Sequence, residues 1–157
     1  MTSMLAQDWT YRDACAAVDV RDRDRSAISD APKRSGEMGF FSHHHRLLRS
    51  RLGNDSPANL VLLLGSGATG EHAWVHKNVG VATVLGYLVN AGTDPATVPI
   101  YRMNPWGTAY GWFLQTDDAQ LVPCAAPDRH PAPVLAEALE LFDQLKTDSR
   151  LAAIKHL

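Results

Sequence analysis

Residues 60–70 read Leu60-Val-Leu-Leu-Leu64 followed by Gly65-Ser-Gly67-Ala-Thr-Gly70, an aliphatic run that leads into a glycine loop. An apolar run of this length is typical of a buried strand. The glycines match G-x-G-x-x-G, a pattern in which the backbone approaches a phosphate and a helix N-terminus faces the anion. The preceding Ser56-Pro57 also fits the start of a helix. Length favours the strand, and a helix here would exclude the phosphate-loop geometry, which needs a strand entering the loop.

A dinucleotide site needs an acidic residue about 20 positions beyond the glycine motif, at the end of the next strand. Asp94 lies in the turn before that expected strand, and the strand ends near Arg102, a residue that would at most meet an extra phosphate. The pattern therefore favours a glycine-rich turn into a helix over a nucleotide site.

The hydrophobic segment after the loop predicts a helix over residues 71–91, with Thr69 as its N-cap and Gly92 at its end. Glycine destabilises a helix interior relative to alanine. We therefore expect another element to approach the helix closely at Gly80 and Gly86.

One side of this predicted helix carries polar residues, namely His72, His76, Thr83, Tyr87 and Asn90. Two histidines four residues apart can bind one metal ion, but a stable zinc site normally needs at least three protein ligands. The candidates for a third ligand are His130, Cys124, Asp117 and the run His43-His44-His45. A stripe facing solvent is the favoured interpretation, and we predict no metal site.

The N-terminal part of the chain predicts little buried structure. Residues 4–18 fit a short helix, and the stretch 19–37 mixes alternating charges with Ser, Pro and Gly. Such a composition buries too little apolar surface to offset the entropy of ordering. We expect residues 1–37 to form an N-terminal segment with a flexible linker, followed by a single globular domain over residues 38–157.

The spacing of apolar residues and turn residues within that domain predicts an α+β fold, in which helices pack on a small antiparallel β-meander. Its expected elements are a helix over 40–52, meander strands over 98–103, 108–115 and 120–124, and a final helix over 133–146 that is interrupted at 147–149. Alternation and helical spacing place Trp112 and Leu139 in the core.

The length and composition of the chain limit the classes of function that fit it. At 157 residues the chain is the size of one domain, and its net charge of -2 gives no drive toward nucleic acid or anionic lipid. Cys15 and Cys124 are isolated, which is typical of a reducing compartment, and the N-terminus lacks a secretory signal pattern. The apolar segment Val79 to Ala91 is shorter than the roughly 20 residues of a spanning helix. We expect a soluble cytoplasmic protein without a membrane partner.

The leading functional hypothesis is a binding or accessory protein that acts through a protein-partner surface or a pocket for a small anionic ligand. Its candidate ligand residues are Gly65, Gly67, Thr69, Gly70, Tyr87, Arg102 and Trp106. The alternative is an enzyme in which His72 and His76 act as metal ligands or as acid and base on a small anionic or phosphorylated substrate, with the loop supplying backbone donors.

A third class, nucleic-acid binding, is disfavoured. It would need the basic group Arg46, Arg49 and Arg51 to share a face with exposed Trp106 or Trp112. The sequence indicates no particular cofactor and no oligomeric state.

Overall fold

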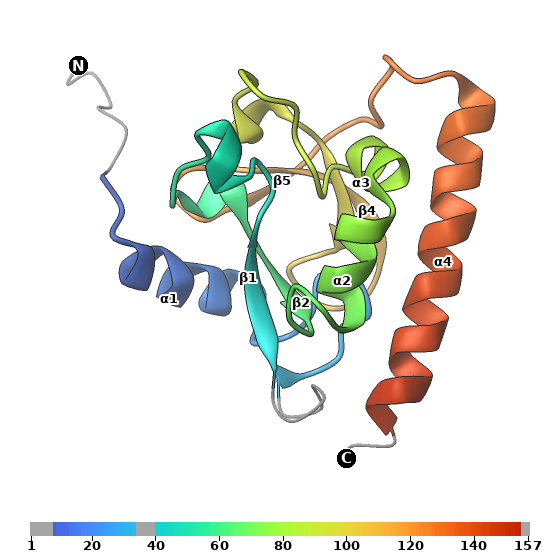
Figure 1. Ribbon diagram of the computed structural model, residues 1–157, viewed down its shortest axis with the longest axis horizontal. Coiled ribbons are helices and arrows are strands. Elements are labelled where there is room, and N and C mark those ends of the chain that lie inside the picture. Colours follow the sequence, from blue (N-terminus) through green and yellow to red (C-terminus); the bar gives the residue numbers. More distant parts are fainter. Residues whose placement is uncertain (1–7, 34–39, 155–157) are drawn as a thin grey trace.

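The computed structural model describes residues 8–33 and 40–154, which form an α+β fold (Figure 1). Its helices are α1 (Tyr11–Arg21), α2 (Gly70–Lys77), α3 (Val79–Leu85) and α4 (Ala132–Ile154), with short 3-10 helices η3 (Arg49–Arg51), η4 (Pro57–Asn59) and η5 (Pro95–Thr97). Its strands are β1 (Phe41–His45), β2 (Leu60–Leu64), β3 (Ile100–Met103), β4 (Tyr110–Gln115) and β5 (Leu121–Pro123). The β3-β4-β5 meander confirms the predicted three-stranded sheet, and β1 and β2 form a second antiparallel sheet.

Strand β2 is the centre of the fold, because both of its faces are covered. Leu60 and Leu62 pack against Ala14 and Val18 of α1, whereas Val61 and Leu63 belong to the larger core cluster with residues of α2 and α3. All five β2 residues are buried. A strand covered on both faces has no polar alternation, which explains the continuous aliphatic run and confirms the strand over the helix.

The helix predicted over residues 40–52 is wrong, since the structure has strand β1 there. β1 pairs with β2 in antiparallel register, with His44 opposite Val61. The spacing of Phe41, Leu48 and Leu52, which predicted the helix, is accidental: Leu52 is 92% exposed and has a φ of 67°. An unpaired β2 would leave buried backbone donors and acceptors unsatisfied, and pairing with β1 satisfies them.

The linker predicted over residues 19–37 is wrong for residues 19–33, and residues 34–37 lie outside the described residues. Ala27 and Ile28 are in the core, and Ser26 and Asp22 are buried with them. The charges that suggested a linker form ion pairs, some at the surface, such as Lys33 with Asp24, and others in the core. Asp22 accepts hydrogen bonds from Arg21 and from Arg102, which is 80 residues away in the sequence.

The predicted single helix over 71–91 is two helices, α2 and α3, which meet at Asn78. α3 ends at Gly86, whose φ of 88° is left-handed, and a side chain there would lie 2.1 Å from the Pro99 carbonyl oxygen. The expected close approach is therefore confirmed at Gly86. At Gly80 it is wrong, because nothing lies within 4 Å of the space that a side chain would fill.

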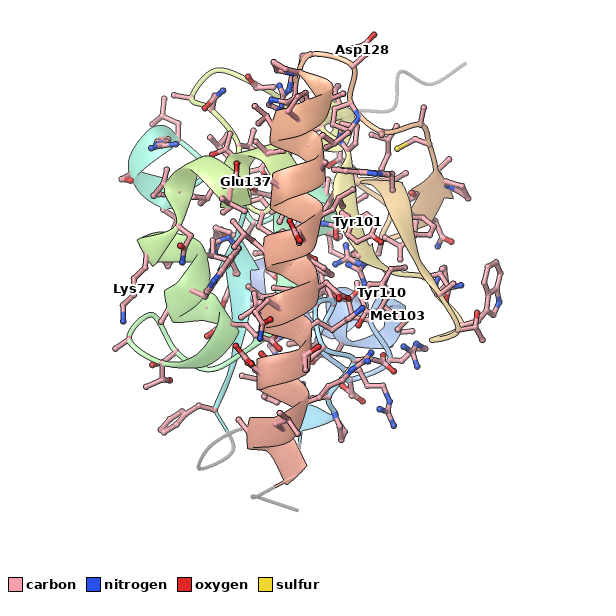
Figure 2. The ribbon with its side chains drawn as sticks, turned by 90° about the vertical axis from the view of Figure 1, so that its right-hand side faces the viewer. Lys77, Tyr101, Met103, Tyr110, Asp128 and Glu137 are labelled. Atoms are coloured by element: carbon pink, nitrogen blue, oxygen red, sulfur yellow. The ribbon has the colours of Figure 1, made fainter. Side chains whose placement is uncertain are left out.

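Helix α4 covers α2 and α3 on one side and the meander on the other (Figure 2). It runs without the interruption predicted at 147–149. Its buried Phe142 contacts the rings of Tyr101 and Tyr110. Trp112 and Leu139 border this cluster but are only partly buried.

Asp22 provides a test of the buried charge network. Burial raises the pKa of this carboxyl group, but the guanidinium groups of Arg102 and Arg21 outweigh burial and lower it from 3.8 to about 2. Since the folded pKa lies below the unfolded one, Asp22 stabilises the fold above about pH 4 and loses that contribution as pH falls to about 2.

We therefore expect Asp22→Asn to lower the free energy of unfolding by about 3 kcal/mol or more at pH 7, because two buried guanidinium groups lose their counter-charge. The deficit should shrink between pH 4 and pH 2, where Asp22 itself becomes neutral. Urea unfolding across this range measures it, with exposed Asp128→Asn as the control. A deficit that does not change with pH would contradict the assignment.

Candidate metal centre

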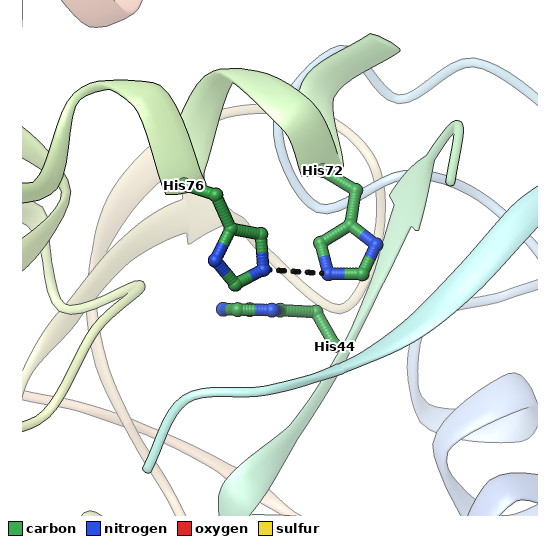
Figure 3. Close-up of side chains that lie close together, drawn as sticks. All are labelled: His44, His72 and His76. Atoms are coloured by element: carbon green, nitrogen blue, oxygen red, sulfur yellow. Dashed lines mark hydrogen bonds between the residues drawn. The ribbon is translucent and has the colours of Figure 1, made fainter. Parts of the chain in front are cut away.

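Three histidine side chains converge between β1 and α2 (Figure 3). His44 comes from the strand, and His72 and His76 come from successive turns of the helix. Each offers one ring nitrogen, and the three nitrogens lie within 4.8 Å of one another. The Nε2 atoms of His72 and His76 are 3.1 Å apart. This histidine cluster is the only such group of potential metal ligands among the described residues.

The alternation of β1 explains why one residue of the histidine run joins the cluster. His44 lies opposite Val61 and therefore faces α2, whereas its neighbours face α1. His43 is hydrogen-bonded to Asp19, and His45 to Asp55. The run thus divides into two part-buried imidazoles that are hydrogen-bonded to carboxylates and one buried imidazole.

The hydrogen bond of His44 fixes which of its nitrogens is available. Its Nε2 lies 2.6 Å from the backbone oxygen of Tyr87. A carbonyl oxygen only accepts, so Nε2 carries the proton and Nδ1 keeps its lone pair. Metal-binding histidines commonly donate their second nitrogen to a carbonyl or carboxylate in this way.

Burial keeps two of the three imidazoles neutral. It lowers the pKa of His44 to about 3, outweighing the hydrogen bond to Tyr87, and His72 and His76 lower it further. Burial, followed by the neighbouring His76, also lowers the pKa of His72 to about 4. Neutral imidazole is the form that binds a metal ion.

The spacing of two of the three nitrogens fits a shared ion, and the His44 nitrogen lies within 4.8 Å of both. Zinc binds imidazole nitrogen at about 2.0–2.1 Å, and tetrahedral ligands at that distance are about 3.3 Å apart. The observed 3.1 Å between His72 and His76 is close to this value. Three protein nitrogens would leave the fourth tetrahedral position open, and exposed His76 lies at the solvent side of the cluster.

Glu71, the acid next to His72 in the sequence, is not part of the histidine cluster. Glu71 is fully buried, and its Oε1 accepts hydrogen bonds from the Ser26 hydroxyl and the Leu64 amide. Burial raises the pKa of this carboxyl group. Its role is to bridge the N-terminal segment to α2.

The other predicted third ligands lie outside the cluster. His130 is hydrogen-bonded to Arg129, Asp117 accepts a hydrogen bond from Trp9 through its backbone oxygen, and the backbone amide of Cys124 donates to Trp112. Of the candidates that the sequence offered, His44 is the one that the fold brings to His72 and His76.

The glycine loop is a strand-to-helix turn that satisfies its own hydrogen bonds. The Ser66 amide donates to the Thr69 hydroxyl, and the Ala68 amide donates to Ser66. A side chain on Gly65 would lie 2.1 Å from the Thr69 carbonyl oxygen, so the turn itself requires glycine there. The strand entering it pairs antiparallel with β1, unlike the parallel sheet of a dinucleotide fold.

The remaining candidate ligand residues do not gather at one place. Tyr87 is fully buried and its hydroxyl donates to the Tyr101 backbone oxygen, while Arg102 is buried against Asp22. Neither side chain is positioned to meet a ligand. Trp106 is 75% exposed and lines a shallow hollow beside α1, away from the other candidates.

The basic residues Arg46, Arg49 and Arg51 do not share one exposed face. Arg46 is fully buried, Arg49 pairs with Asp55 at the surface, and Arg51 donates to the Val89 backbone oxygen.

Comparison with known proteins gave no match: no family model matches the sequence, and no curated protein or solved structure matches the chain. None of the helices in the described residues is long and apolar enough to cross a membrane. The histidine cluster therefore has to be interpreted from its own geometry.

Arg46 holds the backbone that accepts the His44 hydrogen bond. Its guanidinium donates to the Gly86 oxygen, next to Tyr87, and to the backbone oxygens of Ala58, Pro95 and Val98. Burial, followed by Arg21, lowers its pKa to about 9, so it remains charged at neutral pH.

Arg46→Met should lower the free energy of unfolding by about 3 kcal/mol or more, because it leaves several buried carbonyl oxygens without donors. Arg49→Met makes the same chemical change at an exposed ion pair and should cost less than about 1 kcal/mol. Urea unfolding of both variants measures the difference. Equal unfolding midpoints would contradict the role assigned to Arg46.

Proposed function

We propose that this protein binds one zinc ion through His44, His72 and His76 and works as a metal-dependent enzyme. The observation that carries the proposal is the third histidine. Two imidazoles on a helix face do not make a stable zinc site, whereas three convergent imidazoles supply the ligands of a catalytic one.

The chemistry of the ligands supports zinc. The cluster contains imidazole nitrogen only, without thiolate or carboxylate. Imidazole suits zinc, copper, nickel and iron, whereas magnesium, calcium and manganese prefer oxygen ligands. Zinc prefers tetrahedral geometry, which fits the spacing of the His72 and His76 nitrogens. It also requires no redox partner.

The number of ligands supports an enzyme over a binding or accessory protein. Structural zinc sites normally have four protein ligands, whereas catalytic sites have three and leave one position for water or substrate. In this enzyme His72 and His76 act as metal ligands instead of as an acid and base. The free Cys15 and Cys124 support a cytoplasmic location.

Untagged protein that is dialysed against zinc and then against metal-free buffer should retain one equivalent, measured by inductively coupled plasma mass spectrometry. His76→Ala, at an exposed position, should lose it without harm to the fold. His44→Gln should also lose it, since its amide can replace the donor to Tyr87 but offers no nitrogen in place of Nδ1.

The matched control is His43→Ala, one residue away on the opposite face of β1. It should retain the zinc. At a free zinc concentration of 100 times Kd, the wild type should gain about 2.7 kcal/mol of stability and the His76→Ala variant almost none. Absence of bound zinc in the wild type, or full retention in both cluster variants, would overturn the proposal.

A further inference from the structure

We infer that the metal centre hydrolyses small uncharged carboxylic esters, using water at the open coordination position as the nucleophile. This inference rests on the proposed zinc site at His44, His72 and His76.

The ligand set favours activation of water. Three neutral imidazoles leave the full double positive charge on the ion, because the cluster includes no carboxylate or thiolate to offset it. A zinc ion in such surroundings acidifies its bound water to a pKa near 7 and generates hydroxide at neutral pH. The site therefore needs little help from a separate base.

Among the described residues, the acid next to the ligands in the sequence is engaged elsewhere, and the cluster has a route to solvent. The nearest acid in the sequence, Glu71, is fully buried and bonded to Ser26 and Leu64. His76 is exposed, so the cluster is reached from the surface on that side. The proton released by the water passes directly to solvent or buffer.

The charges around the site favour a carbonyl substrate over a phosphoryl one. Phosphoryl transfer is commonly assisted by a second metal ion or an arginine clamp. The described residues contain no second group of potential metal ligands. Arg46 is fully buried, Arg49 is paired with Asp55, and the amides of Ser66 and Ala68 donate within the glycine loop.

The reaction balances without a redox partner. Bound water gives a proton to solvent, and the resulting hydroxide forms a bond to the carbonyl carbon of the ester. The tetrahedral intermediate then collapses, the carbon–oxygen bond to the alcohol breaks, and the alcohol leaves as an alkoxide or phenoxide that solvent protonates as its pKa requires. The carboxylic acid product gives its remaining proton to solvent and departs as the carboxylate, and a new water takes its place.

The test uses p-nitrophenyl acetate, an uncharged ester whose hydrolysis releases a coloured phenolate. Free imidazoles also attack this ester, so the rate of the metal-free protein is the baseline. Zinc-loaded wild type should exceed that baseline by at least about tenfold. Azide, a small anion that competes for the open position, should return the rate toward the baseline.

Two variants separate the outcomes. His43→Ala should keep both the zinc and the added rate, whereas His76→Ala should lose both. Protein that holds one zinc ion but hydrolyses the ester no faster than its metal-free form would overturn this inference and leave the zinc site intact. Protein that retains no zinc would overturn the proposed function itself.

Discussion

The buried guanidinium of Arg46 is the constraint on which the arrangement of the central elements depends. A charge in the core must have its donors satisfied, and no carboxylate of the described residues is hydrogen-bonded to this one. Four backbone oxygens meet it instead, from Ala58, Gly86, Pro95 and Val98. These oxygens belong to three separate connections, so the end of β1 joins η4, the end of α3 and η5 at one point.

The histidine cluster depends on this junction. Fixing the turn at Gly86 places the Tyr87 oxygen where it accepts the Nε2 proton of His44. The pairing of β1 with β2 then turns the same imidazole toward α2. A helix and a strand that are distant in sequence thus present His44, His72 and His76 to a common point.

The parts of the fold that follow from local pattern could be predicted from the sequence. The aliphatic run of β2 and the turn chemistry between β3, β4 and β5 are both readable over a few residues. The burial of the N-terminal segment could not be predicted in this way, because Asp22 is held in the core by Arg102, 80 residues further along the chain. The helical spacing of Phe41, Leu48 and Leu52 conceals β1, because this strand is set by its pairing with β2.

The candidate site shows the same limit. The pairing of His72 with His76 follows from helical periodicity, but the choice of His44 among the possible third ligands depends on the register of β1 against β2. A strand interpretation of residues 41–45 would have set His44 apart from His43 and His45, and would have provided the missing signal.

X-ray absorption spectroscopy of the zinc-loaded protein tests the central claim most directly, because it reports the atoms bound to the metal without requiring activity. The account predicts four light ligands at about 2.0–2.1 Å, with outer-shell scattering from three imidazole rings and one water oxygen. A sulfur neighbour at about 2.3 Å, or scattering from fewer than three imidazoles, would contradict it.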